Sequence, residues 1–229
     1  AGRVEAVGRN ATQFQPGDEV FGDISECGWG GFAEYVCASE HAFALKPAGM
    51  TFEQMAAVPV AATTALQGLR DKGEIKQGIK VLINGASGGV GTFAVQLAKF
   101  YGAEVTAVCS RGKMDMVKSL GADIVIDYTK EDFTRNGQEY DLILAANGYH
   151  PLSDYKRSLS SRGRYVMTGG TGAQMFQAVF LGSLMSKRRG KKLSMLMADT
   201  NKKDMIFIKE LLESGKILPV IDKHYPLNE

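Results

Sequence analysis

Cysteine is scarce in this sequence, with three residues in 229, and no two of them form a C-x-x-C pair. An odd cysteine count without such a pair argues against a disulfide framework and is typical of a reducing compartment. No apolar run reaches the roughly 18 residues that a membrane span needs, and the first residues lack the basic start and apolar core of a signal peptide. These absences predict a cytoplasmic protein without a membrane segment.

The sequence also lacks a large excess of charge of one sign and a cluster of metal-binding residues. The formal net charge is +2, which gives no case for a nucleic-acid or anionic-membrane partner. The three histidines (His41, His150 and His224) lie far apart and the cysteines do not cluster, so no metal site is predicted. The basic run at 187–192 is like a nucleic-acid-binding or localisation signal. It follows a predicted helix, whose dipole favours cations at the C-terminal end, so we interpret it as a solvated loop.

Residues 1 to about 47 have a β-rich pattern. Short apolar segments near 4–7, 19–21, 32–36 and 41–45 are separated by glycine turns, which is typical of a small barrel or part of one. So few strands cannot close a core, and the chain lacks an initiator methionine, so we expect a fragment. The next segment predicts a short helix over 51–58, capped by Thr51, and a second from residue 61 or 63 to 72, with Pro59 as an interruption.

Strands and helices alternate from residue 80 onward, which predicts an α/β fold with a doubly wound parallel sheet in the strand order 3-2-1-4-5-6. The predicted strands cover 80–84, 104–109, 123–127, 140–146, 163–168 and 192–198. The predicted helices cover 89–101, 112–120, a short stretch near 130–135, 151–160, 173–186 and 201–214. We therefore predict a first domain over 1–60, a dinucleotide-binding domain over 61–215, and a return of the chain to the first domain over 216–229.

A glycine-rich turn joins the first of these strands to its helix. Ala86, Gly88 and Gly91 occupy the small-residue positions of the G-x-G-x-x-G fingerprint. Backbone amides at such a turn, with the positive end of the helix dipole, bind phosphate. The predicted cofactor contacts are Ser87, Gly88, Gly89 and Val90. The alternatives are a plain strand-to-helix turn, or a hydrolase elbow because 85–89 formally matches G-x-S-x-G, although no convincing Asp and His partners follow.

The end of the second predicted strand indicates which dinucleotide is bound. NAD sites usually carry Asp or Glu there for the ribose 2′-hydroxyl. This chain has Ser110, Arg111 and Lys113 instead, a hydroxyl and two cations suited to a 2′-phosphate, so NADP is predicted. Tyr128, after the third strand, lies at the same edge and could contact the adenosine phosphate. The alternative is a solvated loop at the start of a helix.

Further turns at the same predicted sheet edge follow the fourth and fifth strands. Asn147 is a candidate hydrogen-bonding partner of the nicotinamide-side ribose. Gly169 and Gly170 belong to a glycine loop whose backbone could approach the nicotinamide. Each of these residues could instead serve only as a turn former.

Motifs along nearly the whole chain resemble those of the medium-chain dehydrogenase/reductase superfamily, in particular its zinc-independent quinone oxidoreductase and enoyl-reductase branch. The similar segments are A-G-R-V-E-A-V-G at 1–8, F-Q-P-G-D-E-V at 14–20, G-F-A-E-Y at 31–35, A-A-V-P-V-A-A-T-T-A at 56–65, the turn at 84–91 and L-G-A-D at 120–123. The resemblance implies a Rossmann domain with a partial GroES-like β-barrel catalytic domain, truncated at both ends.

The resemblance also implies an activity, which is hydride transfer from NADPH to a small-molecule quinone or α,β-unsaturated carbonyl compound in a cleft between two domains. It places Thr63 and Thr64 near the nicotinamide and its ribose, leaves the catalytic proton donor unknown, and is compatible with a homodimer. The zinc-dependent members carry four closely spaced cysteines where this chain has only Cys27. The alternatives are a non-catalytic NADP(H)-binding redox sensor or structural protein, and a zinc alcohol dehydrogenase whose ligands precede residue 1.

Overall fold

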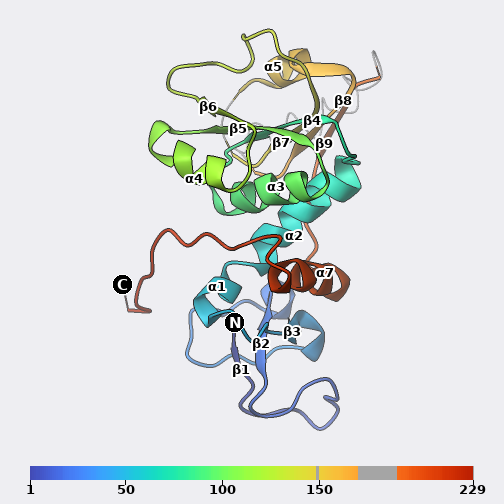
Figure 1. Cartoon of the computed structure of the whole chain (residues 1–229). Coiled ribbons are helices and arrows are strands. Elements are labelled where there is room, and N and C mark those ends of the chain that lie inside the picture. Colours follow the sequence, from blue (N-terminus) through green and yellow to red (C-terminus); the bar gives the residue numbers. More distant parts are fainter. Residues whose placement is uncertain (148–149, 170–189, 229) are drawn as a thin grey trace. The chain divides into compact units, whose positions relative to one another are not determined.

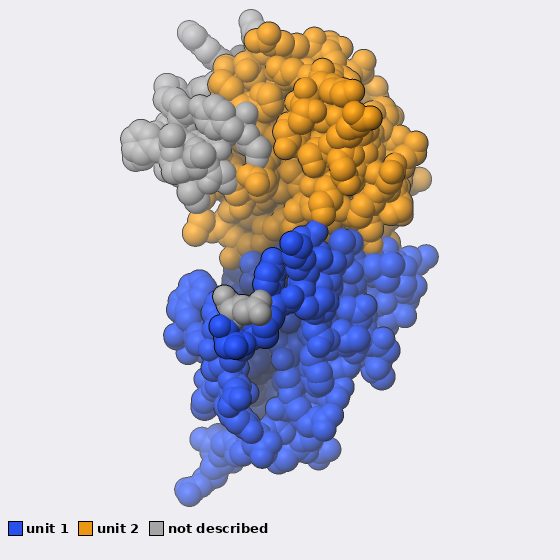
Figure 2. Space-filling model, turned by 90° about the vertical axis from the view of Figure 1, so that its left-hand side faces the viewer, with its two compact units in different colours: residues 1–63, 199–229 blue, residues 64–198 orange. Residues whose placement is uncertain are grey.

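The computed structural model describes residues 1–147, 150–169 and 190–228 of the chain. These residues form two compact units, which Figure 2 shows in separate colours: residues 1–63 with 199–229, and residues 64–198. The domain limits at 60 and 215 stay a prediction. In the structure, the segment from 199 to 215 belongs to the first unit rather than to the one with the parallel sheet.

The first unit contains a three-stranded antiparallel sheet. Strand β2 (Glu19–Gly22) pairs with β1 (Gly2–Arg3) on one side and β3 (Phe43–Leu45) on the other. The centre of this sheet is apolar, because Phe21 and Ala44 are buried. Helix α7 (Lys202–Glu213) packs against β3, which explains why that segment belongs to this unit.

Two predicted strands of the first unit are wrong. Residues 4–7 form no strand, because β1 ends at Arg3. Residues 32–36 form bends and loop, and the described segment between the 3₁₀ turns η1 (Ser25–Cys27) and η2 (Glu40–Ala42) contains no strand. A strand on a folded sheet buries alternate side chains, but Phe32 and Tyr35 are both largely exposed. The alternating pattern was present, but the segment has no neighbouring strand with which to pair.

The helices before the parallel sheet follow the predicted order. Helix α1 (Phe52–Ala56) begins with the predicted cap at Thr51, whose hydroxyl accepts from the Gln54 amide in a capping box. Pro59 begins helix α2 (Pro59–Gln67) rather than interrupting one, because proline suits the first helical position, where its missing N–H has no intrahelical partner. The helix continues as the π-helical turn η3 (Gly68–Lys72).

The second unit is built on a six-stranded, fully parallel sheet. Its strands are β4 (Lys80–Asn84), β5 (Glu104–Cys109), β6 (Ile124–Asp127), β7 (Tyr140–Ala145), β8 (Leu159–Met167) and β9 (Lys192–Met195). Their order in the sheet is β6-β5-β4-β7-β8-β9, which is 3-2-1-4-5-6 for this unit. The predicted order is therefore confirmed, and the chain reverses direction across the sheet between β4 and β7, as in a Rossmann fold.

Helices cover both faces of the sheet (Figure 1). Helix α3 (Gly89–Phe100) packs on β4 and β5, and α4 (Met114–Ser119), preceded by the 3₁₀ turn η4 (Arg111–Lys113), packs on β5 and β6. Helix α5 (Leu152–Arg157) lies on the other face. The short helix predicted near 130–135 is wrong, because Asp132 accepts from the amide and hydroxyl of Thr134 and closes a turn instead. The helix predicted over 173–186 lies outside the described residues.

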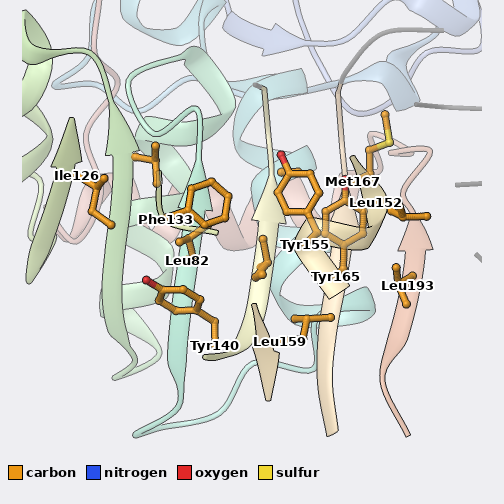
Figure 3. Close-up of a cluster of buried hydrophobic side chains, with 13 residues drawn as sticks. Leu82, Ile126, Phe133, Tyr140, Leu152, Tyr155, Leu159, Tyr165, Met167 and Leu193 are labelled. Atoms are coloured by element: carbon orange, nitrogen blue, oxygen red, sulfur yellow. The ribbon is translucent and has the colours of Figure 1, made fainter. Parts of the chain in front are cut away.

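Aromatic rings dominate the core on the α5 face (Figure 3). Tyr155 of α5 packs its ring 4.6 Å from that of Tyr165 and 5.9 Å from that of Phe133, measured between centroids. Leu82 of β4 belongs to the same cluster. Because side chains alternate along a strand, Asn84, two residues later, points toward this same face.

Candidate functional site

The glycine turn begins where β4 ends, at the point where the sheet order reverses. Gly85 has a left-handed φ of 83°, and its amide and that of Ala86 both donate to the carbonyl of Val108, at 3.2 and 3.0 Å. These bonds fasten the turn to the end of β5. The first residues of the turn are therefore anchored from the side on which the adenosine half of a dinucleotide would lie.

The helix after the turn presents its amino end at the same edge. The i→i−4 bond from the Thr92 amide to the Gly88 carbonyl starts the regular ladder of α3, so the amides from Gly89 to Gly91 precede it. Such amides have no i→i−4 partner and carry the positive end of the helix dipole. Gly88 and Gly89 are exposed and Ser87 and Val90 half-buried, an arrangement that leaves room for a phosphate against the backbone.

The predicted 2′-phosphate residues come together at the ends of β5 and β6. Ser110 occupies the cap position of η4 with an extended backbone, but its hydroxyl makes no capping hydrogen bond. Arg111 and Lys113 are exposed within the same turn. The Tyr128 amide donates to the Cys109 carbonyl at 3.2 Å, which brings the exposed Tyr128 beside this loop. The structure thus places four of the predicted residues around one edge of the sheet.

A carboxylate does lie near this basic loop, at the end of β6 rather than β5. Asp127 Oδ1 accepts from the hydroxyl of Thr129 at 2.8 Å and from its amide at 3.0 Å. These hydrogen bonds, together with the positive charges of Lys130 and Arg111, hold the pKa of Asp127 below its usual range. The carboxylate is thus ionised at neutral pH, and its Oδ1 is engaged within its own turn.

The nicotinamide-side residues that the structure describes are also close to the glycine turn. The Asn147 amide donates to the Asn84 carbonyl at 3.1 Å, and a Cβ built on Gly85 would lie 2.8 Å from the Asn147 nitrogen. A Cβ on Gly169 would lie 2.6 Å from the Ala146 carbonyl oxygen. The turns after β4, β7 and β8 therefore adjoin one another, as predicted for Asn147 and Gly169. Gly170 lies outside the described residues.

The turn η3 runs along β7 toward this edge. A Cβ on Gly73 would touch Leu142, and one on Gly68 would touch Leu144, so the helical segment runs antiparallel to the strand. Thr64 lies one turn before Gly68, about 6 Å further along the helix axis. Thr64 consequently lies toward the carboxyl ends of the strands, and its contact with the cofactor stays a prediction.

Thr63, next to Thr64, carries an unusual hydroxyl. Among the side chains that the structure describes, its Oγ1 is the buried polar atom without a hydrogen-bond partner. A buried hydroxyl left unpaired costs about 1–3 kcal/mol, and bound groups often supply the missing partner. In the second unit, the glycine turn with its exposed Gly88 and Gly89 fits the pyrophosphate of a dinucleotide.

Sequence reasoning missed one pair of residues at this site. The Asn84 side-chain nitrogen donates to the Tyr155 hydroxyl at 2.8 Å, and both side chains are buried. The signal available in the sequence was the polar residue that ends the otherwise apolar strand 81–84. Its partner, 71 residues later, could not be identified without the fold.

Other features of the described residues do not extend the site. A hollow of about 620 Å³, lined in part by Thr134, Arg157 and Ser158, lies at the beginnings of β7 and β8, the edge opposite the glycine turn. No three His, Cys, Asp or Glu side chains in the described ranges are grouped to hold a metal ion. Nor do those ranges contain a helix long and apolar enough to cross a bilayer.

The strand order and the glycine turn at the reversal point define the second unit as a Rossmann-type dinucleotide-binding unit, and the first unit contains an antiparallel sheet. Two family models match the chain: "Alcohol dehydrogenase GroES-like domain" over residues 1–48 and "Zinc-binding dehydrogenase" over residues 120–229. With the relatives described next, which match nearly all of this chain, these matches show that the chain belongs to the medium-chain dehydrogenase/reductase superfamily.

Similar proteins include plant and bacterial oxidoreductases. The chain is 37% identical to the chloroplast envelope quinone oxidoreductase homolog of Arabidopsis thaliana, over 100% of this chain and 71% of that protein. It is 34% identical to the chloroplastic NADPH-dependent alkenal/one oxidoreductase of the same plant, over 99% of this chain and 55% of that protein. The solved quinone oxidoreductase of Coxiella burnetii superposes with a TM-score of 0.85 at 29% identity, covering 99% of this chain and 70% of that one.

Proposed function

We propose that this protein is an NADPH-dependent oxidoreductase that transfers hydride to quinones or α,β-unsaturated carbonyl compounds without zinc. The observation that carries the proposal is the similarity, over the whole chain, to proteins named as a quinone oxidoreductase and an NADPH-dependent alkenal/one oxidoreductase. The loop at Ser110, Arg111 and Lys113 supports the choice of NADP, because it offers cations where an NAD site usually has a carboxylate.

Different residues of the second unit bind different parts of the dinucleotide. The turn from Ser87 to Val90 holds the pyrophosphate with backbone amides, helped by the dipole of α3. Arg111 and Lys113 bind the 2′-phosphate as an ion pair partner and a point charge, and Ser110 donates its uncommitted hydroxyl. Tyr128 lies beside them as a contact for the adenosine half.

The nicotinamide half belongs to the adjoining turns of the sheet edge. Asn147 binds the ribose, Gly169 and Gly170 allow the backbone to approach the ring, and Thr64 approaches from α2. When bound, NADPH supplies the hydride, and the protein orients the ring and excludes water from it. No residue of the chain is assigned as the proton donor, so the acid of the reaction stays unknown.

The main test is turnover by the full-length protein. NADPH oxidation, followed by its absorbance, is expected to accelerate when a quinone or an enone is added, and NADH is expected to serve poorly. A protein that binds NADPH tightly but oxidises it with neither acceptor would instead be a non-catalytic sensor or structural protein. Equimolar zinc in the purified protein, with activity lost to a chelator, would replace the proposal by a zinc alcohol dehydrogenase.

Location and assembly complete the proposal. We place the protein in the cytoplasm because its few cysteines are typical of a reducing compartment, although the two Arabidopsis relatives carry chloroplast in their names. We propose a homodimer as the assembly. Cell fractionation and sedimentation equilibrium measure these two properties, and recovery in an organelle or as a monomer would contradict them.

A further inference from the structure

Asn84 occupies the centre of the sheet edge that faces the proposed cofactor. It is the last residue of β4 and is paired with Val108 of β5 on one side and Ala145 of β7 on the other. Its carbonyl oxygen accepts two hydrogen bonds, from the amides of Ala146 at 3.0 Å and Asn147 at 3.1 Å. The peptide group after Asn84 therefore sets the start of the glycine turn and the path of the turn after β7 together.

The side chain of Asn84 is held in place by the core on one face of the sheet. It shares a face of the sheet with Leu82, and only 5% of it is exposed. Its amide nitrogen donates to the hydroxyl of Tyr155 at 2.8 Å. A buried amide with such a partner is held in one orientation, because rotating it away would leave a polar group unpaired in an apolar core.

Tyr155 is in turn immobilised by the aromatic cluster. Its side chain is fully buried, with the rings of Tyr165, Phe133 and His150 at centroid distances of 4.6, 5.9 and 5.8 Å. Burial raises the pKa of the Tyr155 hydroxyl to about 12, so the hydroxyl is protonated at neutral pH. Figure 3 shows this ring among the core side chains of the sheet face.

We propose that Tyr155 is a positioning residue for the cofactor, which acts through Asn84 on the two turns that hold the dinucleotide. The inference rests on the proposed function, because it assumes that these turns bind NADPH. Tyr155 does not itself contact the cofactor. Its hydroxyl orients Asn84, and the Asn84 carbonyl holds Ala146 and Asn147, so a rigid core group determines the spacing of the pyrophosphate and ribose contacts.

The experiment that tests this role replaces Tyr155 by phenylalanine in the full-length protein. Tyr155→Phe keeps the ring and its packing but removes the partner of the Asn84 amide. We expect the Kd for NADPH, measured by its fluorescence, and the KM for NADPH to rise roughly tenfold, about 1.4 kcal/mol of binding. The KM for the quinone is expected to stay within about twofold of wild type, since that substrate does not contact these turns in the proposal.

Tyr165→Phe is the matched control. It removes a hydroxyl from the neighbouring ring of the same cluster, 4.6 Å away between centroids, while the Tyr155–Asn84 bond stays in place. We expect its NADPH affinity to equal that of the wild type. A purely structural role of Tyr155 would lower the folded fraction, and hence the apparent kcat, without moving the KM for NADPH. An unchanged Kd for NADPH in folded Tyr155→Phe would overturn the proposal.

A second variant covers the outcome in which Tyr155→Phe does not fold. Asn84→Leu combined with Tyr155→Phe replaces both partners by apolar groups of similar shape, which is often nearly neutral for stability. The double variant also lacks the anchor, so its Kd for NADPH is again expected to rise, and wild-type affinity would overturn the inference. If the wild type itself does not bind NADPH, the proposed function fails instead, so the two failures are distinguishable.

Discussion

Gly91, in the first turn of α3, lies directly against the carbonyl group of Gly85. A Cβ built on Gly91 would be 2.2 Å from the Gly85 oxygen and 2.7 Å from backbone atoms of Ala86. Both ends of the glycine turn are therefore in backbone contact, and no side chain fits between them. Gly88, between the two, is different, since its Cβ would have an ordinary contact of 3.5 Å with the same oxygen.

Because of this difference, alanine at position 91 should affect stability, whereas alanine at position 88 should affect NADPH binding. Gly91→Ala forces backbone atoms apart and is expected to reduce the free energy of unfolding by about 1–3 kcal/mol, as overpacking does. Gly88→Ala has room and an ordinary φ of −81°, so its unfolding free energy should change by less than about 0.5 kcal/mol. Its added methyl group nevertheless lies where we place the pyrophosphate, so its NADPH affinity should fall. Urea unfolding and NADPH fluorescence measure the two effects, and normal NADPH binding by Gly88→Ala would contradict the pyrophosphate position.

The basic loop is expected to determine the choice of dinucleotide. Replacing Arg111 and Lys113 by alanine removes two charged contacts to the 2′-phosphate, each of about 1.5–3 kcal/mol when well formed. We expect the Kd for NADPH to rise at least roughly tenfold and the Kd for NADH to change little. Lys118→Ala, an exposed cation on the adjoining helix α4, is the control for net charge. Equal losses for NADPH and NADH would mean that the loop does not bind the 2′-phosphate.

Alkaline pH should destabilise the native state through the buried tyrosines. The Tyr155 hydroxyl ionises near pH 10 in the unfolded chain, whereas burial raises its native pKa to about 12. Between these values the unfolded state binds fewer protons, so stability falls as the pH rises, by about 2–3 kcal/mol for this group. Urea unfolding from pH 8 to 11 measures the first half of this loss, about 1.4 kcal/mol. Tyr155→Phe should show a shallower decline, and an identical pH dependence would show that this hydroxyl is not buried in the native state.

Thiol labelling provides a test of the burial at the end of β5. Cys109 is buried, and desolvation together with the negative charge of Asp127 raises its pKa, whereas Cys37 is exposed and Cys27 half-buried. Because the thiolate is the reactive form, a disulfide reagent should modify Cys37 and Cys27 quickly and Cys109 only after unfolding. Cys109→Ala should remove the slow phase alone. Rapid modification of all three thiols in the native protein would contradict the placement of β5.

Much of the second unit could be predicted because its signals are local. The apolar run at 81–83 followed by small residues indicates a buried strand and a tight turn, and both lie where they were expected. The 32–36 segment shows the limit of such patterns. Its alternation matches a strand, yet Phe32 is 96% exposed, because pairing depends on a neighbour that the local sequence does not specify.

The sequence by itself determined the alternation of strands and helices, the glycine turn and the basic loop after β5, because each depends on residues close together in the chain. Only the tertiary structure decided that Asn84 is bonded to Tyr155, that Thr63 has an unpaired buried hydroxyl, and that Asp127 is held by Thr129 beside Arg111. These relationships depend on which faces and strand ends meet after folding. The glycine turn is thus a local motif, whereas its anchoring in the aromatic core is a property of the packed sheet.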